Sequence, residues 1–94
     1  MNIELLRKGC ELAGMPTIYV GGAWHAVESG KLMLKVTSPE HLEWIKSRCA
    51  SLLVAKVREM GDDGHWMLAQ HIGMMATDEQ RIVAAITVLE DKQP

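Results

Sequence analysis

The sequence predicts a small α+β domain of two layers, in which helices pack on a three-stranded antiparallel meander in the order α-β-β-β-α-α-α. The central observation is the stretch 17–36, where apolar and polar residues alternate around two pairs of turn residues, Gly21-Gly22 and Ser29-Gly30. Such pairs join neighbouring strands in two-residue hairpins. On both sides of this stretch, apolar residues recur at spacings of three and four, which indicates amphipathic helices. The 94 residues show no linker and no internal repeat, so we expect residues 1–94 to form a single domain.

The first helix is expected from about Ile3 to Ala13, because its apolar residues share one face. Asn2 can cap its N-terminus, and Gly14 followed by Pro16 ends it. The apolar face consists of Ile3, Leu6, Cys10 and Ala13.

Two-residue turns would fix the register of the meander. The expected opposed pairs are Val20 with Ala23, Tyr19 with Trp24, Val27 with Leu32, His25 with Leu34 and Trp24 with Lys35. One face is then almost wholly apolar, and we expect helices to cover it; it holds Ile18, Val20, Ala23, His25, Val27, Leu32, Leu34 and Val36. The other face, expected to look outward, holds Thr17, Tyr19, Trp24, Ala26, Glu28, Lys31, Met33 and Lys35.

Three more helices are expected after the meander. A long helix starts with Ser38 as N-cap and Pro39 at the first helical position, and runs to about Met60. A shorter helix follows from His65 to Met75, and the capping-box spacing at 77–80 starts the last helix. The expected core stripes are Leu42, Ile45, Cys49, Leu53, Val57 and Met60, and then Ile82, Val83, Ile86 and Leu89. Packing between elements is also the expected role of Trp44, Trp66, Met67 and Met75.

The composition excludes several classes of protein. With 48% hydrophobic and 23% charged residues the chain is too apolar for a disordered protein, and two Cys are too few for a disulfide scaffold. No run of 18 apolar residues occurs, and charges stand at Glu4, Arg7, Lys8 and Glu11 near the N-terminus. Neither a membrane span nor a signal peptide is therefore expected. We expect a cytoplasmic protein.

No pattern of residues points to catalysis, to a metal or to a cofactor, and we expect none of the three. The four His and two Cys lack the close paired spacing of zinc ligands. The acidic pair at 62–63 and His65 form a compact group, but no nucleophile motif surrounds any Ser. Met67, His71, and Met74 or Met75 have a helical spacing that could hold Cu(I), although packing is the commoner use of such methionines.

The outward sheet face is the candidate functional site. There Tyr19 and Trp24 form an opposed aromatic pair, with Met33 and Lys35 beside them and Lys31 at the rim. Aromatic and methionine side chains ringed by charge are typical of the centres of protein interfaces, so we expect these five residues to bind a protein partner. Two alternatives stay open: helices or a second subunit cover this face, or the face stacks the bases of a nucleic acid or nucleotide.

Charge is divided unevenly along the chain. Residues 1–58 hold eight basic and five acidic residues, a net charge of +3, whereas residues 59–94 hold two basic and seven acidic residues, a net charge of −5. A dipolar domain of this kind can associate with itself or present one charged face to a partner. In the nucleic-acid alternative the phosphate contacts come from Lys31, Lys35, Lys46, Arg48, Lys56 and Arg58. The total charge of −2 counts against that alternative.

These observations predict a non-enzymatic accessory module, an inhibitor or adaptor that docks a protein partner through the aromatic sheet face. Phage-encoded antagonists of host systems are one class of such small proteins. A homodimer is expected, stabilised by the long helix at 40–60, because a domain of this size buries only a limited core. His25, on the apolar sheet face, is expected either to be a buried imidazole bonded to backbone or to make a pH-dependent contact.

Overall fold

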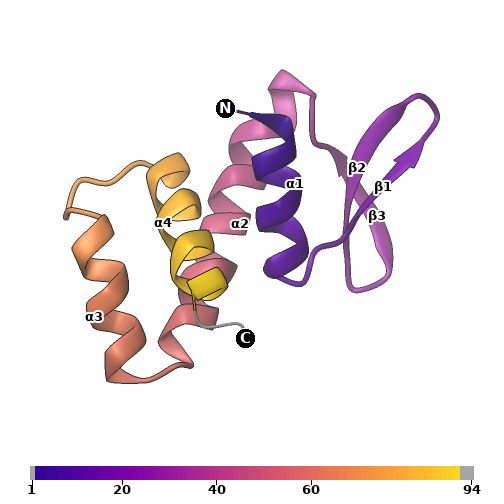
Figure 1. The fold of residues 1–94 in the computed structure, drawn as a ribbon. Coiled ribbons are helices and arrows are strands. Elements are labelled where there is room, and N and C mark those ends of the chain that lie inside the picture. The colour runs from indigo at the N-terminus through magenta and orange to yellow at the C-terminus, as the bar shows by residue number, and fades with distance from the viewer. Residues whose placement is uncertain (1, 92–94) are drawn as a thin grey trace.

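The computed structural model describes residues 2–91, and the side chains of Leu32 and Met33 lie outside the described part. Figure 1 shows the elements in chain order: α1 (Ile3–Leu12), β1 (Thr17–Val20), β2 (Ala23–Glu28), β3 (Lys31–Lys35), α2 (Pro39–Arg58), α3 (Asp62–His71) and α4 (Asp78–Asp91). The strands form one antiparallel sheet in the order β1-β2-β3. The predicted fold class and element order are confirmed. Within the described residues, no helix is both long enough and apolar enough to cross a membrane.

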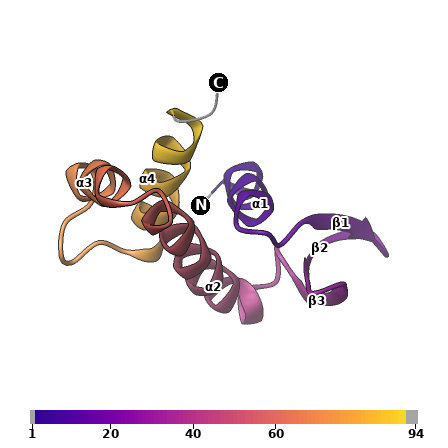
Figure 2. The ribbon, with the colours of Figure 1, turned by 90° about the horizontal axis from the view of Figure 1, so that it is seen from below.

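The sheet stands at one end of the helical part of the molecule. Figures 1 and 2 show the elements spread along the long axis, from α3 at one end through α4 and α1 to the strands at the other. The molecule is accordingly elongated, with extents of 42 × 28 × 19 Å. Helix α2 packs against the other three helices, whereas the sheet is contacted by α1 at β1 and by α2 at β3.

The helix starts follow the capping residues that the sequence predicted. In α1 the backbone N–H of Glu4 donates to Oδ1 of Asn2 at 2.9 Å. Before α4 the N–H of Gln80 donates to Oγ1 of Thr77 at 3.2 Å, and the N–H of Thr77 donates to Oε1 of Gln80 at 2.9 Å. This reciprocal capping box satisfies two backbone donors that the helix itself leaves free. Ser38 is the N-cap of α2, although its side chain makes no capping bond.

The core is built where α1, α2 and α4 meet. The stripe predicted for α2 is confirmed, since Ile45, Cys49, Leu53 and Val57 are all fully buried. In α4 the buried face is rotated from the predicted one: Val88 is buried whereas Val83 is 45% exposed. Gly9 lets α1 approach closely, because a Cβ there would lie 3.1 Å from both Cys49 Sγ and Ile82 Cγ2.

The predicted sheet register is confirmed for β1 and β2 but is wrong for part of β3. Tyr19 pairs with Trp24 and Val20 with Ala23 as expected, and Val27 pairs with Leu32.

Beyond Val27 a bulge shifts the register, so His25 pairs with Lys35 instead of Leu34. The N–H of Val36 consequently donates to the C=O of Trp24 at 2.9 Å. A bulge adds one residue to one strand, and each side chain beyond it moves to the opposite face.

The prediction of which sheet face is covered is also wrong. On the face that holds Trp24, Ala26 and Val36 are fully buried and Thr17 is nearly so. On the face predicted to be covered, Ile18 is 41% and Val20 is 44% exposed. The bulge transfers Val36 to the Trp24 side, and the small side chains of Thr17 and Ala26 allow close approach of the helices there.

Helix α3 is displaced along the chain from its predicted range of His65 to Met75. It begins at Asp62 after Gly61, whose φ of +85° favours glycine, and ends at His71, because Ile72 is extended with φ −130° and ψ 148°. The acidic residues at 62–63 fall in its first turn, where they face the positive end of the helix dipole. Gly64 is buried against the end of α2, and a Cβ there would overlap the carbonyl oxygen of Val57.

Three side chains predicted to pack between elements are exposed instead: Trp44 at 42%, Trp66 at 69% and Met75 at 94%. Met75 lies beyond the observed end of α3, so no helix holds it against the core. Met60 and Met67 do pack against the core, which confirms the prediction for these two.

Candidate functional site

The aromatic pair of the predicted site is formed, but Trp24 lies on the side of the sheet that faces the helices. The Tyr19 and Trp24 rings meet edge to face, with centroids 5.4 Å apart and an interplanar angle of 69°. The guanidinium carbon of Arg7 in α1 lies 3.2 Å from the centre of a Trp24 ring. Nε of Arg7 also donates to Oγ1 of Thr17 at 3.3 Å. Trp24 therefore holds α1 to the sheet, and Tyr19, 62% exposed, is the accessible member of the pair.

The other residues of the predicted site do not gather around this pair. Lys31 pairs with Glu28, whereas Lys35 pairs with His25 on the far side of the bulge. The two lysines therefore belong to opposite faces of the sheet. Met33 lies in β3 by its backbone, but its side chain is outside the described part of the chain. Partner binding by these residues stays a prediction.

His25 is half-buried on the outer face of the sheet, where its Nδ1 lies 3.2 Å from the C=O of Ala23. The predicted bond to backbone is therefore present, although the ring is not fully buried. A shallow hollow beside it is lined by His25, Leu34, Lys35, Ser38, Glu40 and His41.

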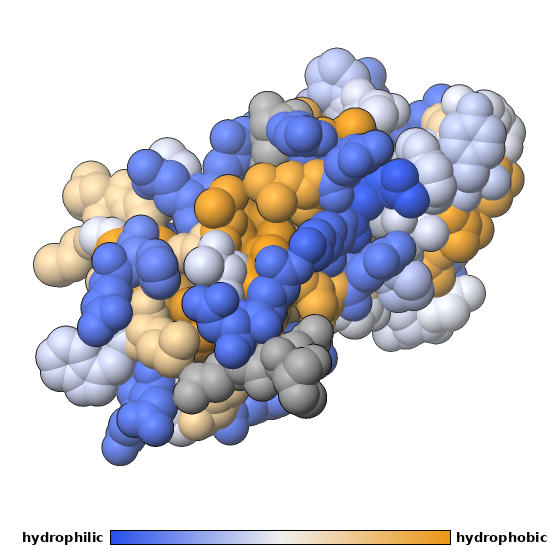
Figure 3. Space-filling model, in the orientation of Figure 1, coloured by the Kyte–Doolittle hydropathy of each residue, from blue (hydrophilic) through white to orange (hydrophobic). Residues whose placement is uncertain are grey.

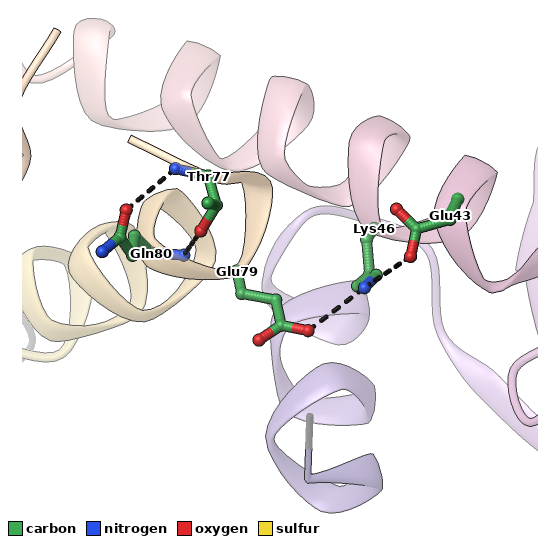
Figure 4. A network of polar contacts seen from close by, with 5 residues as sticks. All are labelled: Glu43, Lys46, Thr77, Glu79 and Gln80. Carbon is green, nitrogen blue, oxygen red and sulfur yellow. Dashed lines mark hydrogen bonds and ion pairs between the residues drawn. The ribbon is translucent and has the colours of Figure 1, made fainter. Parts of the chain in front are cut away.

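Two cations of the predicted phosphate-binding set are engaged within the fold. Lys46 is nearly buried between two carboxylates, with Nζ 2.7 Å from Glu43 and 3.1 Å from Glu79 (Figure 4). Hydrogen bonds to Glu43 and Glu79 raise the pKa of Lys46, and the bond from Lys46 lowers the pKa of Glu79. Arg48 lies 2.6 Å from Glu28 of β2. The cations of residues 1–58 therefore do not form one free surface.

The two cysteines belong to the core. Cys10 of α1 and Cys49 of α2 are both free thiols and fully buried. The hydrogen bond with Cys10 and burial raise the pKa of the Cys49 thiol, which keeps it protonated and unreactive. Among residues 2–91 no group of three or more His, Cys, Asp or Glu is arranged to hold a metal ion.

A groove that was not expected from the sequence lies between α2 and α3, near the start of α4. Its cavity is about 630 Å³, within the range of binding sites in proteins. Its floor is apolar, with Ala50 and Val54 from α2, Leu68 from α3, and Ile72 from the residue directly after α3. Arg58, His65 and Arg81 add cationic or titratable groups around this floor. The lining is completed by Ser51, Ala69, Gly73 and Met74.

The chain beside the groove exposes unusually large apolar side chains. Met74, which lines the groove, is 98% exposed, and its neighbour Met75 is 94% exposed. Trp66 of α3 is 69% exposed. The surface in Figure 3 shows apolar colours at the α3 end of the molecule, interrupted by hydrophilic residues. Contiguous exposed apolar surface marks interaction sites more often than isolated exposed residues do, and Met74 and Met75 are neighbours along the chain.

The sequence carries a partial signal for this groove. Ala50, Val54 and Arg58 recur at a spacing of four on α2, next to the main core stripe, and Leu68 and Ile72 have the same spacing at the end of α3 and just beyond it. A second stripe of this kind indicates a second contact surface. A stripe of this kind does not reveal whether another part of the same chain covers it. In this structure the second stripe is only partly covered, and the groove stays open.

Compared with protein-family models, with curated proteins and with solved structures, the chain matches none.

Proposed function

We propose that this chain is a non-enzymatic protein-binding module whose partner docks in the groove between α2 and α3. The observation that carries the proposal is an open, apolar floor bordered by Met74, whose side chain is almost entirely exposed. Methionine adapts its shape to different partners, and apolar groups with arginine nearby are enriched in protein interfaces. The docking surface proposed here lies at the opposite end of the molecule from the sheet face, where Trp24 already packs against α1.

The finer expectations are compatible with this surface. A cytoplasmic inhibitor or adaptor, including a phage-encoded antagonist of a host system, needs a docking surface and no reaction centre. The acid and imidazole group at 62–65 is accounted for by the start of α3, where acidic residues stabilise the helix dipole. The nucleic-acid alternative is less favoured, because Lys46 and Arg48 are paired with carboxylates.

Self-association is better supported at β1 than at α2. The apolar stripe of α2 is buried inside one copy of the chain, so it offers little to a second copy. Strand β1 is an open edge of four uncharged residues, whereas the other edge, β3, carries Lys31, Lys35 and the bulge. Charged residues and bulges protect sheet edges from pairing, and β1 has neither. We therefore propose that two copies pair through β1.

The backbone of β1 is suited to such pairing. The N–H of Val27 donates to the C=O of Pro16 at 2.8 Å, and hydrogen-bonded and non-bonded pairs alternate along an antiparallel ladder. The backbone groups of Thr17 and Tyr19 therefore point to the open edge. An antiparallel pair centred on Ile18 would join these groups symmetrically and bring the two Ile18 side chains together, as a two-fold interface requires.

The docking proposal is tested by placing a photo-crosslinking amino acid at Met74 in cells that contain the natural partners. A control protein carries the same amino acid at Glu11, an exposed position of α1 outside the groove. The proposal expects a distinct protein adduct at Met74 that is absent at Glu11 and is lost in an Ala69→Glu variant. Equal adducts at both positions, or none at Met74, would contradict it.

A further inference from the structure

We infer that the segment docking in the α2–α3 groove is an amphipathic helix that carries acidic residues about two turns apart. This inference rests on the proposed function and adds the chemistry of the partner. It follows from three properties of the groove: its walls, its charge and the length over which the charge is spread.

The walls of the groove are two neighbouring helices, which is the shape that accepts a third helix. Ala50, Val54 and Arg58 follow one another at one-turn intervals along α2, and His65 and Leu68 do so along α3, with Ile72 directly beyond its end. Grooves between such rows receive the apolar ridge of another helix. The groove residues of α2 extend from Ala50 to Arg58, about 12 Å along the helix axis, so the floor matches about two turns of a docked helix.

The charge of the groove favours an acidic partner. Its three ionisable lining residues are Arg58, His65 and Arg81, and the residues that line it include no carboxylate. Within residues 2–91, the ion pair of Arg81 is a long contact of 3.7 Å with Asp78. Because arginine side chains are cationic, Arg58 and Arg81 make the groove attract a negatively charged segment and repel a basic one.

The two arginines stand at opposite ends of the groove. The ion pair between Lys46 and Glu79 holds the start of α4 beside the N-terminal half of α2 (Figure 4), and Arg81 follows two residues later. Arg58 is the last residue of α2, next to the turn into α3. Ser51 and Arg58 both line the groove and are separated by a rise of about 10 Å along α2. Carboxylates seven residues apart on a docked helix would meet both ends.

A phosphate-bearing ligand fits this arrangement less well. The two arginines are spread along an apolar floor, whereas a phosphate is held by donors that converge on one point. Apolar side chains of a helix would cover Val54, Leu68 and Ile72, which a nucleotide phosphate would leave exposed. The exposed Met74, which also lines the groove, supplies an adaptable apolar contact.

The test uses a designed 15-residue helical peptide with leucines on one face, two glutamates seven residues apart beside them, and a fluorescent label. A second peptide has lysines in place of the two glutamates. Binding to the full chain is measured by fluorescence anisotropy at low salt. We expect the glutamate peptide to bind about tenfold more tightly than the lysine peptide, and this preference to shrink as salt is added.

Variants of the chain locate the binding. Arg58→Glu with Arg81→Glu should reverse the preference, so that the lysine peptide binds more tightly. Ala69→Glu places a charge in the groove and should weaken the glutamate peptide, whereas the matched control Gln70→Glu adds the same charge to exposed surface outside the groove and should not. Circular dichroism identifies any variant that fails to fold, and Arg58→Gln with Arg81→Gln, which should abolish the preference, then replaces the charge-reversed pair.

Several outcomes would overturn the inference. The two peptides binding equally, or the preference surviving charge reversal, would show that the arginines do not select the partner. Binding of ATP at the groove with both peptides inactive would assign it to a phosphate ligand. If neither peptide binds but the Met74 cross-link still captures a partner, the helix inference fails while the proposed docking site stands. If the Met74 cross-link also captures no partner, both the helix inference and the proposed docking site are wrong.

Discussion

The guanidinium carbon of Arg7 lies 3.2 Å from the centre of a Trp24 ring, and this contact joins the first helix to the middle strand of the sheet. Cation–π contacts are strongest with tryptophan, and the same guanidinium group also bonds Thr17 of the edge strand. Few other polar contacts join α1 to the strands in the described residues, so Arg7 should contribute clearly to the docking of the sheet.

We expect Arg7→Ala to lower the free energy of unfolding by about 1–2 kcal/mol, because it removes both the cation–π contact and the hydrogen bond. Urea unfolding monitored by circular dichroism measures the change. Lys8→Ala is the matched control, since it removes an exposed ion pair with Glu90 and should cost about 0–1 kcal/mol. Equal effects of the two substitutions would mean that the ring contact adds nothing to stability.

Acid should weaken the junction of α2 and α4 through Glu79. Its pKa is lowered in the folded chain by the bond from Lys46, so its contribution to stability is present above the ordinary Glu pKa of about 4.3 and is lost as the pH falls through the lower folded value. We expect Glu79→Gln to lower the urea midpoint at pH 7 and the difference from the unmodified chain to disappear at acidic pH. Glu11→Gln, on exposed α1, is the control. A difference that stays constant into acid would contradict this prediction.

Alanine should be poorly tolerated at one glycine of α3 and well tolerated at another nearby glycine. A Cβ at Gly64 would overlap the carbonyl oxygen of Val57 and crowd Met60, whereas nothing lies within 4 Å of a Cβ at Gly73. We expect Gly64→Ala to cost about 1–3 kcal/mol, as overpacking commonly does, and Gly73→Ala to change stability little. Thermal unfolding of the two variants measures both effects, and similar melting temperatures would show that α3 shifts freely on α2.

A charge on the open strand edge should prevent self-association. We expect Ile18→Lys to convert any dimer into a monomer in sedimentation velocity experiments, because it places two like charges opposite each other. Val83→Lys is the matched control, since Val83 is 45% exposed on α4 compared with 41% for Ile18 on β1. If the chain is monomeric at every concentration tested, the proposal that two copies pair through β1 is wrong. If a dimer forms and Ile18→Lys does not affect it, the dimer interface lies outside β1.

The helices and the hairpins were predictable because their signals are local. Asn2, the Thr77–Gln80 pair and the apolar stripe of α2 act within a few residues of themselves, and the structure follows each of them. The covered face of the sheet was not predictable, because one extra residue in β3 changes which side chains share a face. Periodicity alone carries no signal for a bulge of this kind.

The candidate site was harder to predict than the fold. The pairing of Tyr19 with Trp24 was predicted correctly. Whether Trp24 is accessible to a partner depends on Arg7, which is distant along the chain and contacts the ring only when α1 packs on the sheet. The groove depends on the early end of α3 at His71, which leaves Met74 and Met75 outside any helix. The spacing of the methionines predicted a longer helix. Continuing the helix through Gly73 is unfavourable, because glycine has a low helix propensity.

The 42 Å length of the molecule keeps the β1 edge and the α2–α3 groove far apart. Pairing of two copies at β1 would therefore leave both grooves open, one at each end of the assembly. A two-ended assembly of this kind can engage two partner segments at once, and the second engagement then occurs at the high effective concentration set by the first. Weak individual docking in each groove would in that way yield tight bivalent capture of a partner that is itself paired or repeated.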